Sequence, residues 1–161
     1  KVHSRFDGAK EKPLLMEVVF LDTNVVLELL DRHRKGHAQA KQLMAKLVEK
    51  ETRIVVSEDM LSTIYYVIHD KPAVLEFIRW MNANWQIVPF GRSVIDQAVK
   101  HCQNSAGQDF EDTLQCYCAK ENSCDLLISN DAAFVECGVL TLRVNDFLQK
   151  DNKNSNTQGD C

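Results

Sequence analysis

Four short acidic or polar clusters, each at the end of an apolar run or the start of a helical pattern, constrain this chain more than any other feature. The clusters are Asp22-Thr23-Asn24, Glu58-Asp59, Asp109-Phe110-Glu111-Asp112 and Asn130-Asp131. Short apolar runs, rich in β-branched residues, alternate along the chain with segments whose apolar residues have helical spacing. This alternation predicts an α/β fold with a parallel sheet. Because the carboxyl ends of parallel strands meet at one edge of the sheet, the clusters are expected to converge there.

The first cluster lies between a predicted strand, residues 17–21, and a predicted helix, residues 25–30. An aspartate directly after a parallel strand would point into the crevice beyond the sheet. Asp22 or Thr23 would serve equally well as the N-cap of the helix that follows. Taken alone, the first cluster leaves both interpretations open.

The second cluster repeats this arrangement, with a predicted strand at residues 52–56 and a predicted helix at residues 58–68. Acidic residues in the first turn of a helix are stabilised by the helix dipole whether or not they have a further function. A structural role is therefore the commoner interpretation for Glu58 and Asp59.

The third cluster begins a helix, and capping explains Asp109 well. Capping explains Asp112 less well, because like charges one helical turn apart are mildly destabilising unless a cation lies between them. The fourth cluster follows a predicted strand at residues 126–129, and an Asx turn is the structural alternative for Asn130 and Asp131.

Convergence of the four clusters favours a metal site over four separate caps and turns. The clusters offer hard oxygen ligands and no matching set of His or Cys residues. Such ligands predict Mg²⁺ or Mn²⁺ as the cofactor, rather than zinc or copper.

Several segments of the chain resemble the motifs of the PIN-domain nucleases, in the order in which that family has them. The segments are residues 19–27, 61–68, 109–115 and 128–131 with Phe134. Each motif is weak alone, but the ordered set is fairly specific and covers residues 17–149. The pattern is most similar to the VapC-type toxins of type II toxin–antitoxin pairs. The resemblance implies a three-layer PIN-like fold, with a central parallel sheet of four to five strands flanked by helices, and a metal-dependent endoribonuclease.

The resemblance also assigns roles to residues of this chain. Asp22 matches the first catalytic acid and Asp112 the third, while Asp131 matches the last acid in relatives that place it directly after the strand. These three residues are the predicted catalytic and metal-binding set. The predicted supporting residues, which would orient the ligands, the phosphate or the water shell, are Asn24, Asp59, Asp109, Glu111, Ser129 and Asn130.

Two positions depart from the family pattern. The second acid of the family falls on Thr63, and the last acid, in the branch that places it before Phe, falls on Ala133. Asp59, one turn before Thr63, would partly replace the missing carboxylate. The departures favour an alternative function, in which a weakened PIN-like domain binds RNA or a protein partner without cleaving it.

Composition fits one soluble globular domain. The chain has 161 residues and a net charge of −4, which argues against strong non-specific binding of nucleic acid. Local basic residues offer an exception, because Arg32, Arg34 and Lys35 follow the first motif and are candidates for substrate binding. A solvated surface is the commoner interpretation of such a run.

The expected partners come from the resemblance. They are an RNA substrate, a small antitoxin whose tail would fill the acidic crevice, and a second copy of the chain in a homodimer. No apolar run approaches the roughly 18 residues of a membrane span, and no signal peptide is visible, so no membrane association is expected.

The six cysteines form neither a Cys-x-x-Cys pair nor a zinc spacing with histidine. Free cysteines that behave as small buried hydrophobic residues, in a reducing cytoplasm, are therefore expected. Residues 1–15 are predicted to be a polar leader or tag remnant, residues 16–150 the PIN-like nuclease domain, and residues 151–161 a disordered tail.

Overall fold

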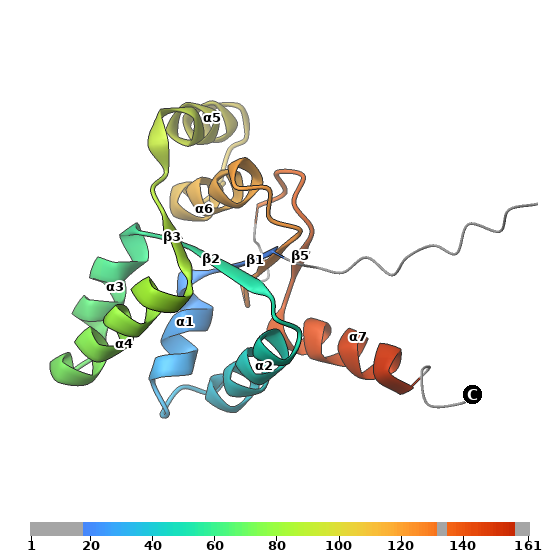
Figure 1. Cartoon of the computed structure of the whole chain (residues 1–161). Helices are drawn as coiled ribbons and strands as arrows, with labels where there is room; N and C mark the ends of the chain where they lie inside the picture. The colour runs from blue at the N-terminus through green and yellow to red at the C-terminus, as the bar shows by residue number, and fades with distance from the viewer. Residues whose placement is uncertain (1–17, 132–134, 157–161) are drawn as a thin grey trace, which may run out of the picture.

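The computed structural model describes residues 18–131 and 135–156, and its centre is a five-stranded parallel sheet (Figure 1). The strands are β1 (Val18–Leu21), β2 (Arg53–Ser57), β3 (Gln86–Val88), β4 (Leu126–Ile128) and β5 (Thr141–Leu142). They lie in the order β3-β2-β1-β4-β5, and every neighbouring pair is parallel. The predicted α/β class and parallel sheet are confirmed.

Helices cover both faces of the sheet, as the three-layer prediction requires. The helices are α1 (Thr23–Leu30), α2 (His37–Glu49), α3 (Asp59–Val67), α4 (Lys71–Asn84), α5 (Gly91–Asn104), α6 (Phe110–Glu121) and α7 (Val144–Asn156). Helices α5 and α6 lie on one face, and α1, α2, α3, α4 and α7 lie on the other (Figure 1).

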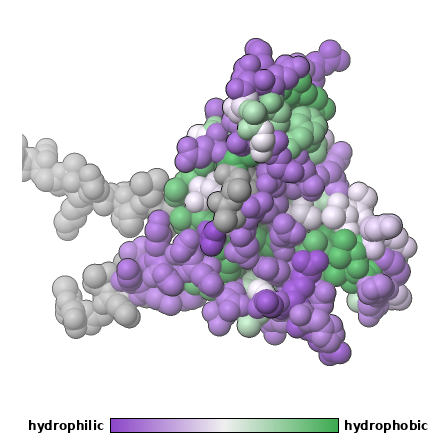
Figure 2. Space-filling model, turned by 180° about the vertical axis from the view of Figure 1, so that it is seen from behind, coloured by the Kyte–Doolittle hydropathy of each residue, from purple (hydrophilic) through white to green (hydrophobic). Residues whose placement is uncertain are grey.

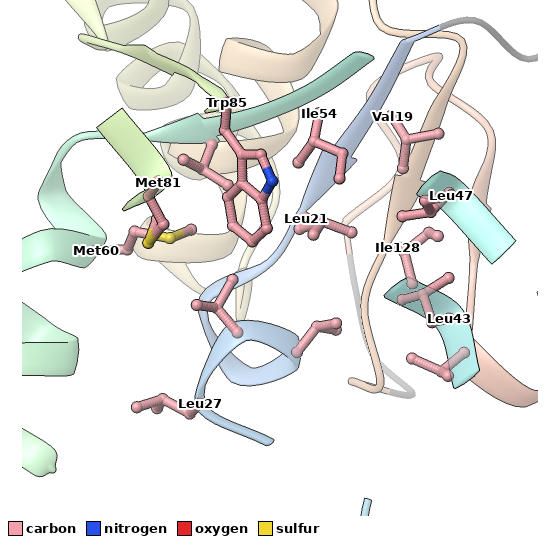
Figure 3. Packing of buried hydrophobic residues seen from close by; sticks show 14 of the residues in the cluster. Val19, Leu21, Leu27, Leu43, Leu47, Ile54, Met60, Met81, Trp85 and Ile128 are labelled. Carbon is pink, nitrogen blue, oxygen red and sulfur yellow. The ribbon is translucent and has the colours of Figure 1, made fainter. Parts of the chain in front are cut away.

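The two cores follow from the two-residue period of a strand. In β1, Val19 and Leu21 point into the larger core against the five-helix layer, whereas Val18 and Phe20 point toward α5 and α6. Figure 3 shows the larger core, where Leu21 lies among side chains from β2, β4 and several helices. A strand that is covered on both faces has a continuous run of apolar residues, and this pattern predicts the first strand.

Two expectations about the ends and the cysteines need correction. Helix α7 continues to Asn156, so the predicted disordered tail is wrong for residues 151–156. Asp151 is buried and forms ion pairs with Lys46 (Nζ to Oδ2, 3.5 Å) and Lys50, which fix this helix against α2. Residues 1–17, 132–134 and 157–161 lie outside the described residues, and these include the predicted leader, the rest of the predicted tail and Ala133.

The cysteines differ from the expectation because Cys116 of α6 forms a disulfide with Cys137. Cys102, Cys118 and Cys124 are free, as expected. The spacing of 21 residues between the bonded pair matches no short motif, so the sequence alone gave no sign of the bond. The disulfide ties α6 to the segment that follows the end of β4.

The surface is mainly hydrophilic on the face shown in Figure 2, with separate hydrophobic patches. Exposed large hydrophobic side chains fall mainly on two parts of the molecule, α3 with α4 (Tyr66, Leu75, Trp80) and α5 (Ile95, Val99). No helix within the described residues is both long enough and apolar enough to span a membrane.

Candidate active site

The site begins where β1 and β4 end side by side. Leu21 pairs with Ile128 in the parallel register, so the next residues, Asp22 and Ser129, become neighbours at the carboxyl edge of the sheet. The Asp22 backbone N–H donates to the Ile128 carbonyl at 3.0 Å. The Ser129 hydroxyl donates to Asp22 Oδ2 at 2.7 Å, and both residues are almost fully buried. The sheet register therefore fixes the position of this carboxylate.

The same hydroxyl also contacts the fourth cluster. Ser129 Oγ accepts a hydrogen bond from the Asp131 backbone N–H at 3.1 Å. One serine thus joins the buried Asp22 to the exposed strand-end residue Asp131. This contact gives a structural reason for Ser129 to support both predicted metal ligands.

Helix α6 brings the third cluster to the same edge. Asp109 caps the helix, because its Oδ1 accepts from the Asp112 backbone N–H at 2.9 Å, as the capping interpretation predicted. Glu111 and Asp112 follow in the first turn. The capped start of α6 therefore places two further carboxyl groups next to the strand ends.

The carboxyl groups of Asp22 and Asp112 both have raised pKa values, and neighbouring carboxylates contribute to each shift. The pKa of Asp22 rises from 3.8 to about 6, chiefly through burial and further through repulsion by Glu111 and Asp131, although the Ser129 hydrogen bond opposes the shift. The pKa of Asp112 rises from 3.8 to about 7, through burial first and then repulsion by Asp22, Asp109 and Asp131. The three predicted metal ligands therefore form one interacting group.

The outer part of the cluster includes the second motif. Burial raises the pKa of Glu111, and the charges of Asp59 and Asp109 raise it further. Ser57, the last residue of β2, donates its hydroxyl to Asp59 Oδ1 and so directs this side chain at the sheet edge. Thr63, the predicted position of the family's second acid, lies one turn further along α3 and is half-buried.

The donor set fits a hard divalent cation. No Lys or Arg of the described residues is among the groups that shift the pKa values of Asp22, Asp112 and Glu111, so these like charges lack a positive neighbour there. Carboxylate oxygens are the ligands that Mg²⁺ and Mn²⁺ prefer. Within residues 18–131 and 135–156, no three His, Cys, Asp or Glu side chains already surround a single metal position.

Two predicted supporting residues have different surroundings from those of Ser129. The Asn130 amide donates to Glu28 Oε2 at 2.7 Å and its Oδ1 accepts from the Val144 N–H at 3.1 Å, so it joins α1 to the start of α7. A Cβ on Gly36 would lie 2.3 Å from the carboxyl carbon of Glu28, so a side chain at this position would displace the Glu28 carboxyl group. Asn24 is exposed in the first turn of α1.

The predicted substrate-binding residues follow the far end of α1. Arg32, Arg34 and Lys35 come after Leu30, whereas Asp22 precedes the other end of this helix. An eight-residue helix is about 12 Å long. Arg34 pairs with Asp31 (Nε to Oδ2, 3.8 Å). The fold therefore does not bring these basic residues beside the carboxylates.

Another basic residue lies nearer to the site. Arg143 directly follows β5 and lines a cleft of about 510 Å³ whose wall also includes Ser129 and Asp131. Arg143 is not among the predicted substrate-binding residues. Its position after a strand end, like that of Asp22 and Ser129, is the signal that would have identified it.

A buried hydrogen bond between α6 and α1 is not predicted by any sequence motif. Gln115 Nε2 of α6 donates to Thr23 Oγ1 of α1 at 2.9 Å. Gln115 lies in the motif that resembles the PIN family, but the motif predicts no separate role for it.

The fold and the acidic edge together define a parallel α/β domain with carboxyl groups gathered at the carboxyl ends of its strands. The family model for the PIN domain matches residues 19–140. Ribonuclease VapC1 of Aquifex aeolicus (strain VF5) is 31% identical over 137 residues, which cover 83% of this chain and 95% of that protein. The chain belongs to the PIN domain family.

Solved structures share the fold at lower identity. Mycobacterium tuberculosis VapC20, a sarcin-ricin loop cleaving toxin, has a TM-score of 0.65 at 16% identity, covering 78% of this chain and 98% of that one. A toxin–antitoxin complex from Klebsiella pneumoniae has a TM-score of 0.60 at 15% identity, covering 78% and 97%. The resemblance noted from the sequence motifs is confirmed.

Proposed function

We propose that this protein is a metal-dependent endoribonuclease that hydrolyses RNA phosphodiester bonds, and that it is the toxin of a type II toxin–antitoxin pair. The observation that carries the proposal is the gathering of Asp22, Asp112 and Asp131 at the sheet edge, where the neighbouring carboxylates help to raise the pKa values of Asp22 and Asp112. The similarity of this chain to Ribonuclease VapC1, which covers most of its length, supports the same activity.

Asp22, Asp112 and Asp131 would hold Mg²⁺ or Mn²⁺. When bound, such an ion lowers the pKa of a water nucleophile and neutralises charge on the phosphate. Ser129 fixes the orientation of Asp22 by donating to Oδ2, and residues that orient a ligand in this way strongly affect metal sites. Asp59, Asp109 and Glu111 add negative charge around the group and so increase its attraction for a cation.

RNA binding needs cationic side chains, because the phosphates dominate affinity. We assign the contact nearest to the scissile phosphate to Arg143, since it shares the cleft with Asp131. Arg32, Arg34 and Lys35, at the far end of α1, would contact more distant phosphates. Substituting Arg143 should therefore raise KM for RNA more than substituting Lys35.

The proposed protein partners follow from the same site and from the surface. A small antitoxin with a basic tail would neutralise the acidic edge, and toxin–antitoxin complexes among the structural neighbours support this assignment.

A homodimer would bury exposed side chains of α3 and α4, including Tyr66 and Trp80. Sedimentation of the purified protein, compared with Trp80→Ala, tests that surface.

A cytoplasmic location is part of the proposal, because an RNA-cleaving toxin acts where RNA is. Disulfides are rare in that compartment, so the Cys116–Cys137 bond is the feature that opposes it. Mass spectrometry of the protein after alkylation in intact cells distinguishes the two thiol states.

The deciding experiment is cleavage of a mixed set of structured RNAs by the purified protein with Mn²⁺ or Mg²⁺, and with EDTA. Asp22→Asn and Asp112→Asn should each lower the rate by on the order of 100-fold or more, because each removes a charged oxygen ligand. Asp96→Asn, on the exposed surface of α5, is the matched control and should keep full activity.

The alternative is a weakened PIN-like domain that binds RNA or a protein without cleaving it. Thr63 favours this function, because it offers no charge at the position of the family's second acid. Cleavage that is absent, resistant to EDTA, or equal in all variants, together with retained RNA binding, would replace the nuclease proposal with this alternative.

A further inference from the structure

A buried hydrogen bond joins the two helices that begin beside the carboxylates. Gln115 Nε2 of α6 donates to Thr23 Oγ1 of α1 at 2.9 Å, across 92 residues of sequence. Gln115 is 1% exposed and Thr23 is 4% exposed. In such a dry environment a hydrogen bond is strong and constrains the geometry of its partners.

Both partners lie next to a predicted metal ligand. Thr23 directly follows Asp22, and it forms the first turn of α1. Gln115 lies three residues after Asp112, and residues at this separation share one side of a helix. The bond therefore connects the rigid element that follows Asp22 to the rigid element that carries Asp112.

The other amide atom of Gln115 reduces what this residue contributes to stability. Gln115 Oε1 is buried and has no hydrogen-bond partner among the described residues. Exchanging the amide oxygen and nitrogen would leave the nitrogen without a partner instead. A buried polar atom without a partner destabilises the fold, so replacing both Gln115 and Thr23 by apolar residues would cost little stability, whereas replacing only one leaves the other without its partner.

We propose that Gln115 is a positioning residue, which sets the separation of the Asp22 and Asp112 carboxyl groups through its hydrogen bond to Thr23. The inference rests on the proposed function, because the separation matters only if these carboxylates share a cation. Residues that orient metal ligands from the second layer contribute roughly 10-fold to 100-fold to affinity or activity.

The test measures Mn²⁺ affinity by calorimetry, RNA cleavage by kcat and KM, and thermal unfolding, on the full chain. Gln115→Leu should raise the Mn²⁺ dissociation constant and lower kcat, each by roughly 10-fold or more, with KM for RNA unchanged. The Thr23→Val, Gln115→Leu double variant leaves neither partner unpaired, so it should show the same losses at a melting temperature close to that of the wild type. Gln103→Leu, the same substitution on the exposed surface of α5, should change none of these values.

A double-mutant cycle separates positioning from general damage. Thr23→Val should reproduce the effect of Gln115→Leu, and the double variant should be no worse than either single variant. Thr23→Ser keeps the hydroxyl and should restore Mn²⁺ affinity. Unchanged Mn²⁺ affinity in Gln115→Leu, or additive losses that follow the melting temperature, would overturn the inference.

The two proposals fail in distinguishable ways. If the wild-type protein binds Mn²⁺ and cleaves RNA while Gln115→Leu equals it, only the positioning role is wrong. If the wild-type protein binds Mn²⁺ without cleaving RNA, the nuclease proposal fails, and the ratio of Mn²⁺ affinities still decides the role of Gln115. If the wild-type protein binds no Mn²⁺, both are wrong.

Discussion

The two sides of the acidic edge are held in place by different means. On the strand side, Asp22 and Ser129 follow neighbouring strands and are buried, so the sheet register and backbone hydrogen bonds fix them. On the α6 side, Glu111 and Asp112 are more exposed and begin a helix. That helix packs on the sheet through Cys116, Cys118 and Ala119, and it is also held by the disulfide at Cys116 and by the Gln115 hydrogen bond.

Because of this difference, the carboxylates of the two sides differ in how easily their positions can be changed. A carboxylate at a central strand end has a position that few local changes can alter. A carboxylate at a helix start moves with the whole helix, so its distance from the strand side depends on how that helix is packed and crosslinked. The geometry of the site is therefore most easily changed on the α6 side.

Breaking the disulfide should have the largest effect on stability. A crosslink that spans 21 residues should contribute about 3 kcal/mol to the free energy of unfolding, measured by urea denaturation of the Cys116→Ala, Cys137→Ala double variant. Native-state hydrogen exchange should increase in α6 and leave β1 and β4 protected up to global unfolding. Equal loss of protection in the strands would show that the two sides form one unit.

Removing the Ser129 hydroxyl should damage the strand side. In Ser129→Ala the buried Asp22 loses the donor at 2.7 Å, and its pKa rises further because this hydrogen bond lowers it. Cleavage activity at neutral pH should fall by roughly 10-fold to 100-fold. The loss should be almost absent in an Asp22→Asn background, whereas an equal loss in that background would mean that Ser129 acts elsewhere.

The strand side was also the part of the site that the sequence predicted best. Apolar runs that end in Asp22 and Ser129 determine the fold class, the strand ends and the edge where they meet, because the strand period and the sheet register are local rules. Asp109 was correctly identified as a cap for the same reason.

The remaining parts depended on contacts between distant segments. No local rule links Gln115 to Thr23, or Cys116 to Cys137, and the partners of Asn130 are Glu28 and the start of α7. Arg32 and Lys35 are close to Asp22 in sequence, but the length of α1 separates them in space. Tertiary packing brings these residues together or keeps them apart. Hydrophobic periodicity reports only on neighbours along the chain, so it does not predict contacts between distant segments.

A pair of variants at Asp109 separates the cap from its charge on the α6 side. Asp109→Ala should lower the free energy of unfolding by about 1 kcal/mol, because the Asp112 N–H loses its acceptor. Asp109→Asn keeps an acceptor and removes a charge that raises the pKa values of Glu111 and Asp112, so it should be neutral or stabilising. Equal destabilisation by both variants, in chemical denaturation at pH 7, would rule out the cap as the cause.

The smallest expected effect is the pH dependence of stability without metal. Because the pKa of Asp112 is raised from 3.8 to about 7, the folded state keeps a proton that the unfolded chain releases within this range. The free energy of unfolding should therefore fall as pH rises from about 4 to 7. Asp112→Asn removes this cost and should be more stable than wild type at pH 8 by less than about 1 kcal/mol, since solvent screens a half-exposed group.

Thermal unfolding in EDTA at pH 4 and pH 8 measures this effect, with Asp96→Asn of α5 as the matched surface control. The stability gain of Asp112→Asn should be present at pH 8 and lost at pH 4, where the wild-type carboxyl is protonated when folded. Added Mn²⁺ should reverse the order at pH 8, because the ion binds the folded wild-type protein more tightly than the variant. A gain that is the same at both pH values would mean that Asp112 does not share the charge of the acidic edge, and the α6 side would then be structural only.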